Sequence, residues 1–247
     1  MTLKLGINGA CGRMGLAVGR LIYEDKNINL TTALENTGSN YIGKDYGIIL
    51  GLGKLGVLIR TGLSNKIDAL IDFSTPSAAM QRIDECIKFK VPIVICTTGL
   101  SKKDLSIIKA ASKKIPCLIS SNMSIGINLL FKLCPDIAKK LGNNYDIAIV
   151  ESHHRFKKDA PSGTAKTLKE NIVNSGLKKD VPIHSIRAGD IVGEHTILYS
   201  TIGETIEITH RAHSRDIFAR GAIAAAKFLA QAKPGLYTMQ DVIEKSL

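Results

Sequence analysis

The stretch Leu3–Gly15, LKLGINGACGRMG, decides the fold of the amino-terminal half. Its first six residues predict a short strand, and Gly9, Gly12 and Gly15 follow as a GxxGxxG pattern at the start of an amphipathic helix. In a dinucleotide-binding turn, one glycine makes the tight bend, one admits the pyrophosphate and one lets the helix pack on the strand. The phosphates then lie on N–H groups at the helix N-terminus. The strand before the pattern and the helix after it indicate a βαβ unit.

An acidic residue stands where such a unit needs one. Glu35 follows the next predicted strand, 28–34, about 20 residues after the glycines. Its carboxylate can accept hydrogen bonds from the adenosine ribose hydroxyls; the alternative is a surface loop acid, which the strand-end position disfavours. Neutral Asn36 comes next, and only Arg13 in the glycine turn offers a nearby positive charge. Glu35 and Asn36 together therefore predict that the cofactor is NADH or NADPH, with NADH preferred.

Strands and helices keep alternating through the first half. The segment 91–96, VPIVIC, is continuously apolar, as expected for a parallel strand that is covered on both faces. Thr97, Thr98 and Gly99 form a turn at its carboxyl end, where doubly wound sheets bind ligands. The predicted elements of this half are strands at 3–8, 28–34, 69–73, 91–96 and 117–120 and helices at 13–23, 76–89 and 101–112. They predict an α/β, Rossmann-type, doubly wound parallel sheet.

The order of elements changes near residue 123. The second half predicts helices at 125–141, 162–174 and 217–232 and strands at 146–150, 184–188, 195–200 and 204–212. Strands grouped beside helices favour a second α+β domain with a mixed or antiparallel sheet. We therefore expect a dinucleotide-binding domain at 1–123, to which 233–247 returns, and a substrate-binding and oligomerisation domain at 124–232. The region 36–66 is glycine-rich and its elements are not predicted.

The segment 151–165, ESHHRFKKDAPSGTA, carries the chemistry. It leaves a strand, brings His and Lys side chains together and runs into a helix start, for which Ser162 is a suitable N-cap. The N–H groups of Gly163 and Thr164 then form an anion site, and the His and Lys side chains can supply protons and positive charge. The alternative is that the two adjacent histidines are ordinary surface residues without a role in catalysis. Zinc is disfavoured because neither HExxH nor CxxC occurs, so no metal is expected.

Composition excludes several classes of function. The net charge is +11, but the basic residues are scattered in pairs, aromatic residues are 5% and there is no Trp, so nucleic-acid binding is not expected. No apolar run is long enough for a membrane helix and the N-terminus is no signal peptide. Five cysteines, an odd number without CxxC, indicate thiols in a reducing compartment. We expect a cytoplasmic enzyme whose partner is a small anionic substrate.

Seven segments, in order, resemble the dihydrodipicolinate reductase family. They span nearly the whole chain and read GACGRMG, DFSTP, TTG, SSNMSIGIN, HHRFKKDAPSGTA, RAGDIVGEH at 187–195 and EITHRAHSR at 207–215. The resemblance implies an enzyme of the lysine and diaminopimelate pathway. It would reduce a cyclic imine-type dicarboxylate, formed by loss of water from 4-hydroxy-tetrahydrodipicolinate, to tetrahydrodipicolinate. NADH or NADPH would supply the hydride.

The same resemblance implies roles for individual residues. His153 matches the proton donor and acceptor, Lys157 the second proton donor and His154 a substrate contact, while Gly163 and Thr164 match the backbone site for a substrate carboxylate. The matched cofactor contacts are Gly9, Ala10, Cys11, Gly12, Arg13, Met14, Glu35, Cys96, Thr97, Thr98, Ser120, Ser121, Asn122 and Met123. The family implies a homotetramer assembled through the sheet of the second domain.

Three positions depart from the family pattern. Phe156 stands where many members carry a further His, Cys96 where Gly often precedes the threonines, and Asn36 where a basic residue often follows the acid. Two other functions are alternatives to this reading. Another two-domain dehydrogenase would need a nucleophilic cysteine, which neither Cys96 nor Cys134 suits, because Cys96 ends a strand and Cys134 lies within an apolar helix pattern. A non-catalytic cofactor-sensing module would keep the glycine turn but would have no need of HHRFK.

Overall fold

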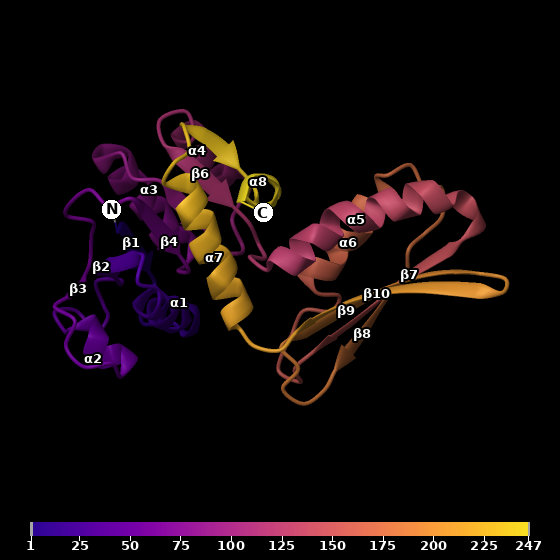
Figure 1. Cartoon of the computed structure of the whole chain (residues 1–247), viewed down its shortest axis with the longest axis horizontal. Coiled ribbons are helices and arrows are strands. Elements are labelled where there is room, and N and C mark those ends of the chain that lie inside the picture. The colour runs from indigo at the N-terminus through magenta and orange to yellow at the C-terminus, as the bar shows by residue number, and fades with distance from the viewer. Residues whose placement is uncertain (1, 247) are drawn as a thin grey trace. The chain divides into compact units, whose positions relative to one another are not determined.

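The computed structural model describes residues 2–246, which form two compact units. The first unit comprises residues 2–123 together with 216–246, and the second comprises Ser124–Arg215. Figure 1 shows the yellow carboxyl-terminal elements beside the purple elements of the first unit. The chain therefore leaves the first unit once and returns to it after completing the second.

A seven-stranded parallel sheet forms the first unit. The strand order is β11-β6-β5-β4-β1-β2-β3, so the order reverses between β1 and β4, where sheets of this kind bind ligands. This confirms the predicted Rossmann-type sheet. The strands are β1 (Leu3–Asn8), β2 (Ile28–Leu34), β3 (Ile59–Arg60), β4 (Ala69–Asp72), β5 (Ile93–Ile95), β6 (Pro116–Ile119) and β11 (Gly235–Tyr237).

Helices pack around this sheet in two groups. In one group α1 contacts α7, and in the other α3 contacts α4. The central strands β4 and β5 are buried along their whole length, which explains the continuous apolar sequence of β5. The helices are α1 (Arg13–Glu24), α2 (Tyr46–Leu50), α3 (Pro76–Phe89), α4 (Lys102–Ala111), α7 (Asp216–Leu229) and α8 (Met239–Ser246).

Local capping signals set the starts of α3 and α4 where the sequence predicts them. The Thr75 side chain accepts a hydrogen bond from the Ala78 amide, and Pro76 occupies the first helical turn, where its missing N–H costs nothing. Ser101 and Asp104 form a reciprocal capping box at the start of α4. Both helices therefore begin at the β-to-α turns on the ligand-binding edge of the sheet.

The expectation that the helix at 217–232 belongs to the second domain is wrong. α7 packs against α1 and against β4, β5 and β6, all in the first unit. A Cβ atom at Gly221 would lie only 1.7 Å from the Met123 carbonyl oxygen, so the helix and the backbone approach without a side chain between them. The alanine-rich face of α7 is thus core of the first unit, and β11 then extends the same sheet beside β6.

The second unit is a four-stranded mixed sheet with its helices on one face (Figure 1). β7 pairs in parallel with β8 and antiparallel with β9, which pairs antiparallel with β10, confirming the predicted mixed sheet. Alternate residues of β9 are buried against the core that these strands share with α5 and α6. The elements are α5 (Ile125–Leu141), the 3-10 turn η1 (Gly142–Asn144), β7 (Asp146–His153), α6 (Gly163–Val173), β8 (Ile183–Arg187), β9 (Gly193–Thr201) and β10 (Glu204–Ala212).

Candidate functional site

The glycine turn between β1 and α1 has space for backbone only. Gly9 has a φ of +74°, and a Cβ there would lie 2.5 Å from the Phe73 carbonyl oxygen. A Cβ at Gly15 would lie 2.3 Å from the Gly9 carbonyl oxygen. Gly12 is the N-cap of α1, and no side chain caps the helix N–H groups there. The turn therefore has the close backbone approach and the uncapped helix start that a pyrophosphate needs.

Glu35 is directly bonded to this turn. Its Oε1 accepts a 2.7 Å hydrogen bond from the backbone N–H of Cys11, which places the carboxylate at the mouth of the turn. A cavity of about 370 Å³ opens beside it. Its lining residues are Asn8, Gly9, Cys11, Gly12, Glu35, Asn36, Ser39, Tyr41, Phe73, Ser74, Thr75 and Ala78. None of them is Arg or Lys, so one carboxylate and otherwise neutral groups line the cavity.

The threonine turn after β5 divides into a structural and an exposed part. Thr97 is buried, and its hydroxyl donates to Asp72 Oδ2 at 2.5 Å and accepts from the Ser74 amide at 3.1 Å. Burial raises the pKa of Asp72 against the opposing effect of the side-chain hydrogen bonds that it accepts from Ser74, Thr97 and Asn8. The Cys96 side chain is also buried, which raises the pKa of its thiol well above the usual value. Only Thr98 is exposed enough to present a side chain to a ligand.

The segment between β6 and α5 is held by its own hydrogen bonds. Ser120 Oγ donates to the Asn122 carbonyl at 2.7 Å and accepts from its amide at 3.3 Å, which closes a tight turn. Ser121 at the tip is exposed, whereas Met123 is buried against α7. The turn follows the carboxyl end of β6, on the same edge of the sheet as the glycine turn.

In the second unit, a charged cluster lies on the strand face that the helices cover. Glu151 of β7 is fully buried and accepts from Arg187 of β8 at 3.0 and 2.7 Å and from the Ser162 amide at 3.2 Å. Its Oε2 also bonds His153 Nδ1. Burial raises the pKa of Glu151, but the hydrogen bonds from Arg187, Ser185 and His153 outweigh it and hold the pKa at about 2. The carboxylate is therefore ionised at neutral pH.

His153 occupies a restricted space at the end of β7. Its ring meets the His195 ring edge to face, with centroids 5.3 Å apart. Burial lowers the pKa of His153, and the bond to Glu151 opposes this. His195 is buried and its Nε2 lies 3.3 Å from Ser162 Oγ; burial lowers the pKa of His195 to about 3. His195 is therefore neutral at pH 7 and contacts the N-cap of α6.

The segment after His153 leads to the start of α6. Ser162 caps that helix as predicted, since its side chain accepts from the Ala165 amide at 3.2 Å. Gly163 is exposed in the first helical turn. Lys157 pairs with Asp159 at 2.8 Å, while the Phe156 side chain is 80% exposed and, besides its contact with the His154 ring, plays no part in the cluster. An imidazole ring, an ammonium group and the start of α6 thus share one unit.

Three residues of this cluster are not predicted from the sequence, namely Glu151, Arg187 and His195. Glu151 and His153 are two residues apart on one strand and so share a face, which is a signal visible in the sequence. Arg187 and His195 enter only through pairing, because Arg187 lies opposite His153 and His195 opposite Glu151. The register of the strands in the sheet therefore brings these residues together, although they are far apart in the sequence.

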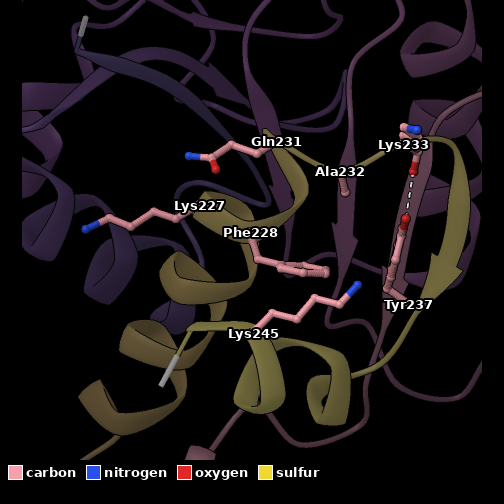
Figure 2. A pocket seen from close by; sticks show the side chains of 7 residues that line it. All are labelled: Lys227, Phe228, Gln231, Ala232, Lys233, Tyr237 and Lys245. Carbon is pink, nitrogen blue, oxygen red and sulfur yellow. Dashed lines mark hydrogen bonds between the residues drawn. The ribbon is translucent and has the colours of Figure 1, made fainter.

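A further cavity of about 490 Å³ lies in the first unit beside α7, β11 and α8. Figure 2 shows that its lysines do not converge: Lys227 points away from Phe228, whereas Lys245 points toward Tyr237. Lys227 pairs with Asp25 at 2.8 Å, and Tyr237 donates to the Lys233 carbonyl at 2.9 Å. This cavity therefore lacks a focused set of ligand groups. Among residues 2–246 no three potential metal ligands of the His, Cys, Asp or Glu type gather, and no helix is long and apolar enough to span a membrane.

A dinucleotide turn on a Rossmann-type sheet, followed by a mixed-sheet unit with a His–Glu–Arg cluster, is the architecture of a two-domain nicotinamide-dependent oxidoreductase. Two family models, described as dihydrodipicolinate reductase N-terminus and C-terminus, match residues 3–123 and 126–243. The chain belongs to the dihydrodipicolinate reductase family. It is an NAD(P)H-dependent oxidoreductase of the diaminopimelate and lysine pathway, which decides against both alternative functions.

Individual relatives agree with the family. The 4-hydroxy-tetrahydrodipicolinate reductases of Syntrophus aciditrophicus and Citrifermentans bemidjiense are 41% and 40% identical, and each match covers 98% of both chains. A dipicolinate-bound dihydrodipicolinate reductase from a Paenisporosarcina species has the same fold, with a TM-score of 0.78 at 22% identity over 96% of this chain and 98% of that one. A probable dehydrogenase from Thermotoga maritima is more distant, with a TM-score of 0.64 at 12% identity over 98% and 93%.

Proposed function

We propose that this enzyme reduces the cyclic imine formed from 4-hydroxy-tetrahydrodipicolinate to tetrahydrodipicolinate, with His153 and Lys157 handling the protons. The observation that carries the proposal is the cluster at the end of β7, where buried, ionised Glu151 bonds both His153 and Ser162, the N-cap of α6. A dicarboxylate substrate needs both positive charge and N–H donors, and the second unit supplies both.

Each side chain has a separate task in this proposal. One substrate carboxylate binds to the N–H groups of Gly163 and Thr164. The His154 side chain also contacts the substrate. Lys157 leaves its surface pairing with Asp159 and donates a proton, and His153 exchanges a proton through Nε2, because Nδ1 is bonded to Glu151. The nicotinamide, when bound, supplies the hydride, and the protein orients the reactants and neutralises charge.

The first unit is proposed to hold the cofactor. The glycine turn, which Gly9, Gly12 and Gly15 keep free of side chains, fits a pyrophosphate, and Glu35 fits the adenosine ribose. Ala10, Cys11, Arg13 and Met14 complete the turn, and the backbone of Cys96–Thr98 and Ser120–Met123 lines the nicotinamide side. This division gives residues 2–123 the cofactor role and Ser124–Arg215 the substrate role.

We further propose that NADH is preferred over NADPH. The ribose cavity contains Glu35 and neutral Asn36, Ser39 and Tyr41, and its lining has no Arg or Lys. A 2′-phosphate would lie beside an uncompensated carboxylate, whereas free hydroxyls can donate to it. Arg13 is exposed at the turn, and its positive charge reduces the preference for NADH over NADPH without reversing it.

We also propose that the enzyme is a homotetramer in the cytoplasm. The face of the second sheet opposite α5 and α6 carries Ala148 and Val150 of β7 and Leu198 of β9, and Ile186 of β8 is 47% exposed. Apolar side chains that α5 and α6 do not cover favour association through this face of the sheet. All five cysteines are free, as a reducing compartment requires. Light scattering of the wild type and of Leu198→Asp tests the assembly: a monomeric wild type contradicts it.

The function itself is tested by a turnover assay. Substrate is generated in place by the preceding synthase, and oxidation of NADH is followed by absorbance. We expect turnover that depends on the synthase product. NADH binding without any turnover on this substrate would contradict the proposal.

A further inference from the structure

Glu151 lies at the centre of the second-unit cluster and contacts three other residues of it. Its carboxylate is hydrogen-bonded to both Nη atoms of Arg187, to the amide of Ser162, the N-cap of α6, and to Nδ1 of His153. It is fully buried, so it does not itself touch a substrate. A single carboxylate thus connects the ring at the end of β7 with the start of α6 and with β8.

The charge of Glu151 decides which nitrogen of His153 carries a proton. An ionised carboxylate only accepts hydrogen bonds, so Nδ1 of His153 must be the donor in their contact. In neutral His153, Nε2 then holds the lone pair and is the atom that exchanges protons with a ligand. Nε2 lies on the side of Gly193, where the absence of a Cβ leaves it space.

A second line of contacts runs from Glu151 to Lys157. Arg187 Nη2 donates both to Glu151 at 2.7 Å and to the Asp159 carbonyl at 2.6 Å. The Asp159 carboxylate in turn accepts from Lys157 Nζ at 2.8 Å. The loop that carries Lys157 is therefore held through the same carboxylate as the His153 ring.

We propose that Glu151 is the positioning residue of this site, holding His153 in the Nδ1–H tautomer and, through Arg187, holding the loop that carries Lys157. The proposal rests on the proposed function in that His153 exchanges a proton with the substrate. It extends that function by assigning a role to a buried acid that does not react. In serine-protease triads, a buried acid has the same relation to its histidine, and replacing it by the amide lowers kcat about 10⁴-fold through the wrong tautomer.

The tautomer can be measured on the wild-type enzyme without any substitution. Long-range proton–nitrogen NMR on ¹⁵N-histidine-labelled protein distinguishes the two neutral forms, and the His153→Gln spectrum assigns the His153 signals. We expect the Nδ1–H form, although a free histidine side chain favours Nε2–H. A wild-type His153 in the Nε2–H form would overturn the proposal.

Glu151→Gln supplies the second measurement. The groups that face His153 are Glu151 on its own strand, Arg187 on β8, His195 on β9 and Lys157 in the loop. Of these only Glu151 is negative, so its loss should lower the pKa of His153 further and shift its tautomer. We expect kcat to fall about 10²–10⁴-fold while the Kd for NADH stays unchanged. The matched control is Glu170→Gln, the same change at an exposed position of α6.

The outcomes separate this proposal from the function on which it rests. If Glu151→Gln keeps the wild-type His153 tautomer and the wild-type kcat, Glu151 is not a positioning residue. If His153→Ala keeps full kcat, the assignment of His153 fails, whereas the tautomer measurement still reports on Glu151. If Glu151→Gln does not fold, the wild-type spectrum alone decides.

Discussion

Gly193 lies directly against the His153 ring. A Cβ atom at Gly193 would be 3.2 Å from Nε2 and 3.4 Å from Cδ2, closer than an ordinary contact. Gly193 begins β9, and the next inward-facing residue on that strand is His195, whose ring also meets His153. The side of His153 that is proposed to exchange protons is therefore shaped by the absence of a side chain on the neighbouring strand.

Gly193→Ala should lower activity without unfolding the protein. The added methyl group displaces the His153 ring by a few tenths of an ångström, and misplacement of a catalytic group on this scale costs about 10-fold in kcat. The melting temperature and the Kd for NADH should change little. Thr201→Ala, at the far end of β9, is the control. Wild-type kcat in Gly193→Ala would show that the ring position has no bearing on turnover.

His153→Ala and Lys157→Ala should each cut kcat while leaving NADH binding nearly intact. Both side chains belong to the second unit, whereas the glycine turn and Glu35 belong to the first. Assistance by a general acid or base is worth about 10²–10⁴-fold. Stopped-flow turnover and fluorescence titration with NADH measure the two effects separately. Wild-type kcat in both variants would contradict the assigned roles.

Gly163→Pro should weaken carboxylate binding at the start of α6. Proline is well tolerated at the first helical position, and Ser162 before it already has the extended conformation, φ −62° and ψ 154°, that a following proline requires. The substitution removes one N–H donor, which is worth about 10–100-fold in affinity when the acceptor is charged. Gly163→Ala keeps the donor, and no atom lies within 4 Å of its Cβ. Calorimetry with dipicolinate compares the two variants, and equal Kd values would argue against a carboxylate here.

Asn36→Arg should shift cofactor preference toward NADPH. A guanidinium at this wall of the ribose cavity can pair with a 2′-phosphate in bidentate fashion and offset Glu35. The ratio of kcat/KM for NADPH over NADH should rise at least about 10-fold. Thr37→Arg adds the same charge one residue away, outside the lining of the cavity, and should leave the ratio near the wild-type value. A wild-type enzyme that already prefers NADPH would contradict the prediction.

The stabilising effect of Glu151 should depend on pH. The pKa of Glu151 in the folded protein is about 2, below its ordinary value of 4.5, so its contribution is complete above about pH 5 and is lost as the pH falls toward 2. A depression of this size corresponds to about 3 kcal/mol. The difference in melting temperature between the wild type and Glu151→Gln should therefore narrow from pH 6 to pH 3. A difference that is constant over this range would show that Glu151 gains no stability from its charge.

Most elements were predictable because their signals are local. The strand, glycine turn and helix of residues 3–24 lie where the sequence predicts them, since turn glycines and apolar periodicity act within a few residues. By contrast, the short helix α2 was missed. Its Tyr46 is held by hydrogen bonds from its hydroxyl to the Ala10 and Gly15 carbonyls, each more than one element away. Contacts of that range leave no periodic signal.

The sequence by itself determined the family, the dinucleotide turn with Glu35, and the segment that carries His153, Lys157 and Ser162. Those features depend on residue types at short, constant spacings. Only the tertiary structure placed α7 in the first unit and brought Arg187 and His195 to Glu151 and His153. The physical reason is that strand register and helix docking depend on how whole apolar faces fit together, so residues 33 to 44 positions apart become neighbours through pairing that no single segment encodes.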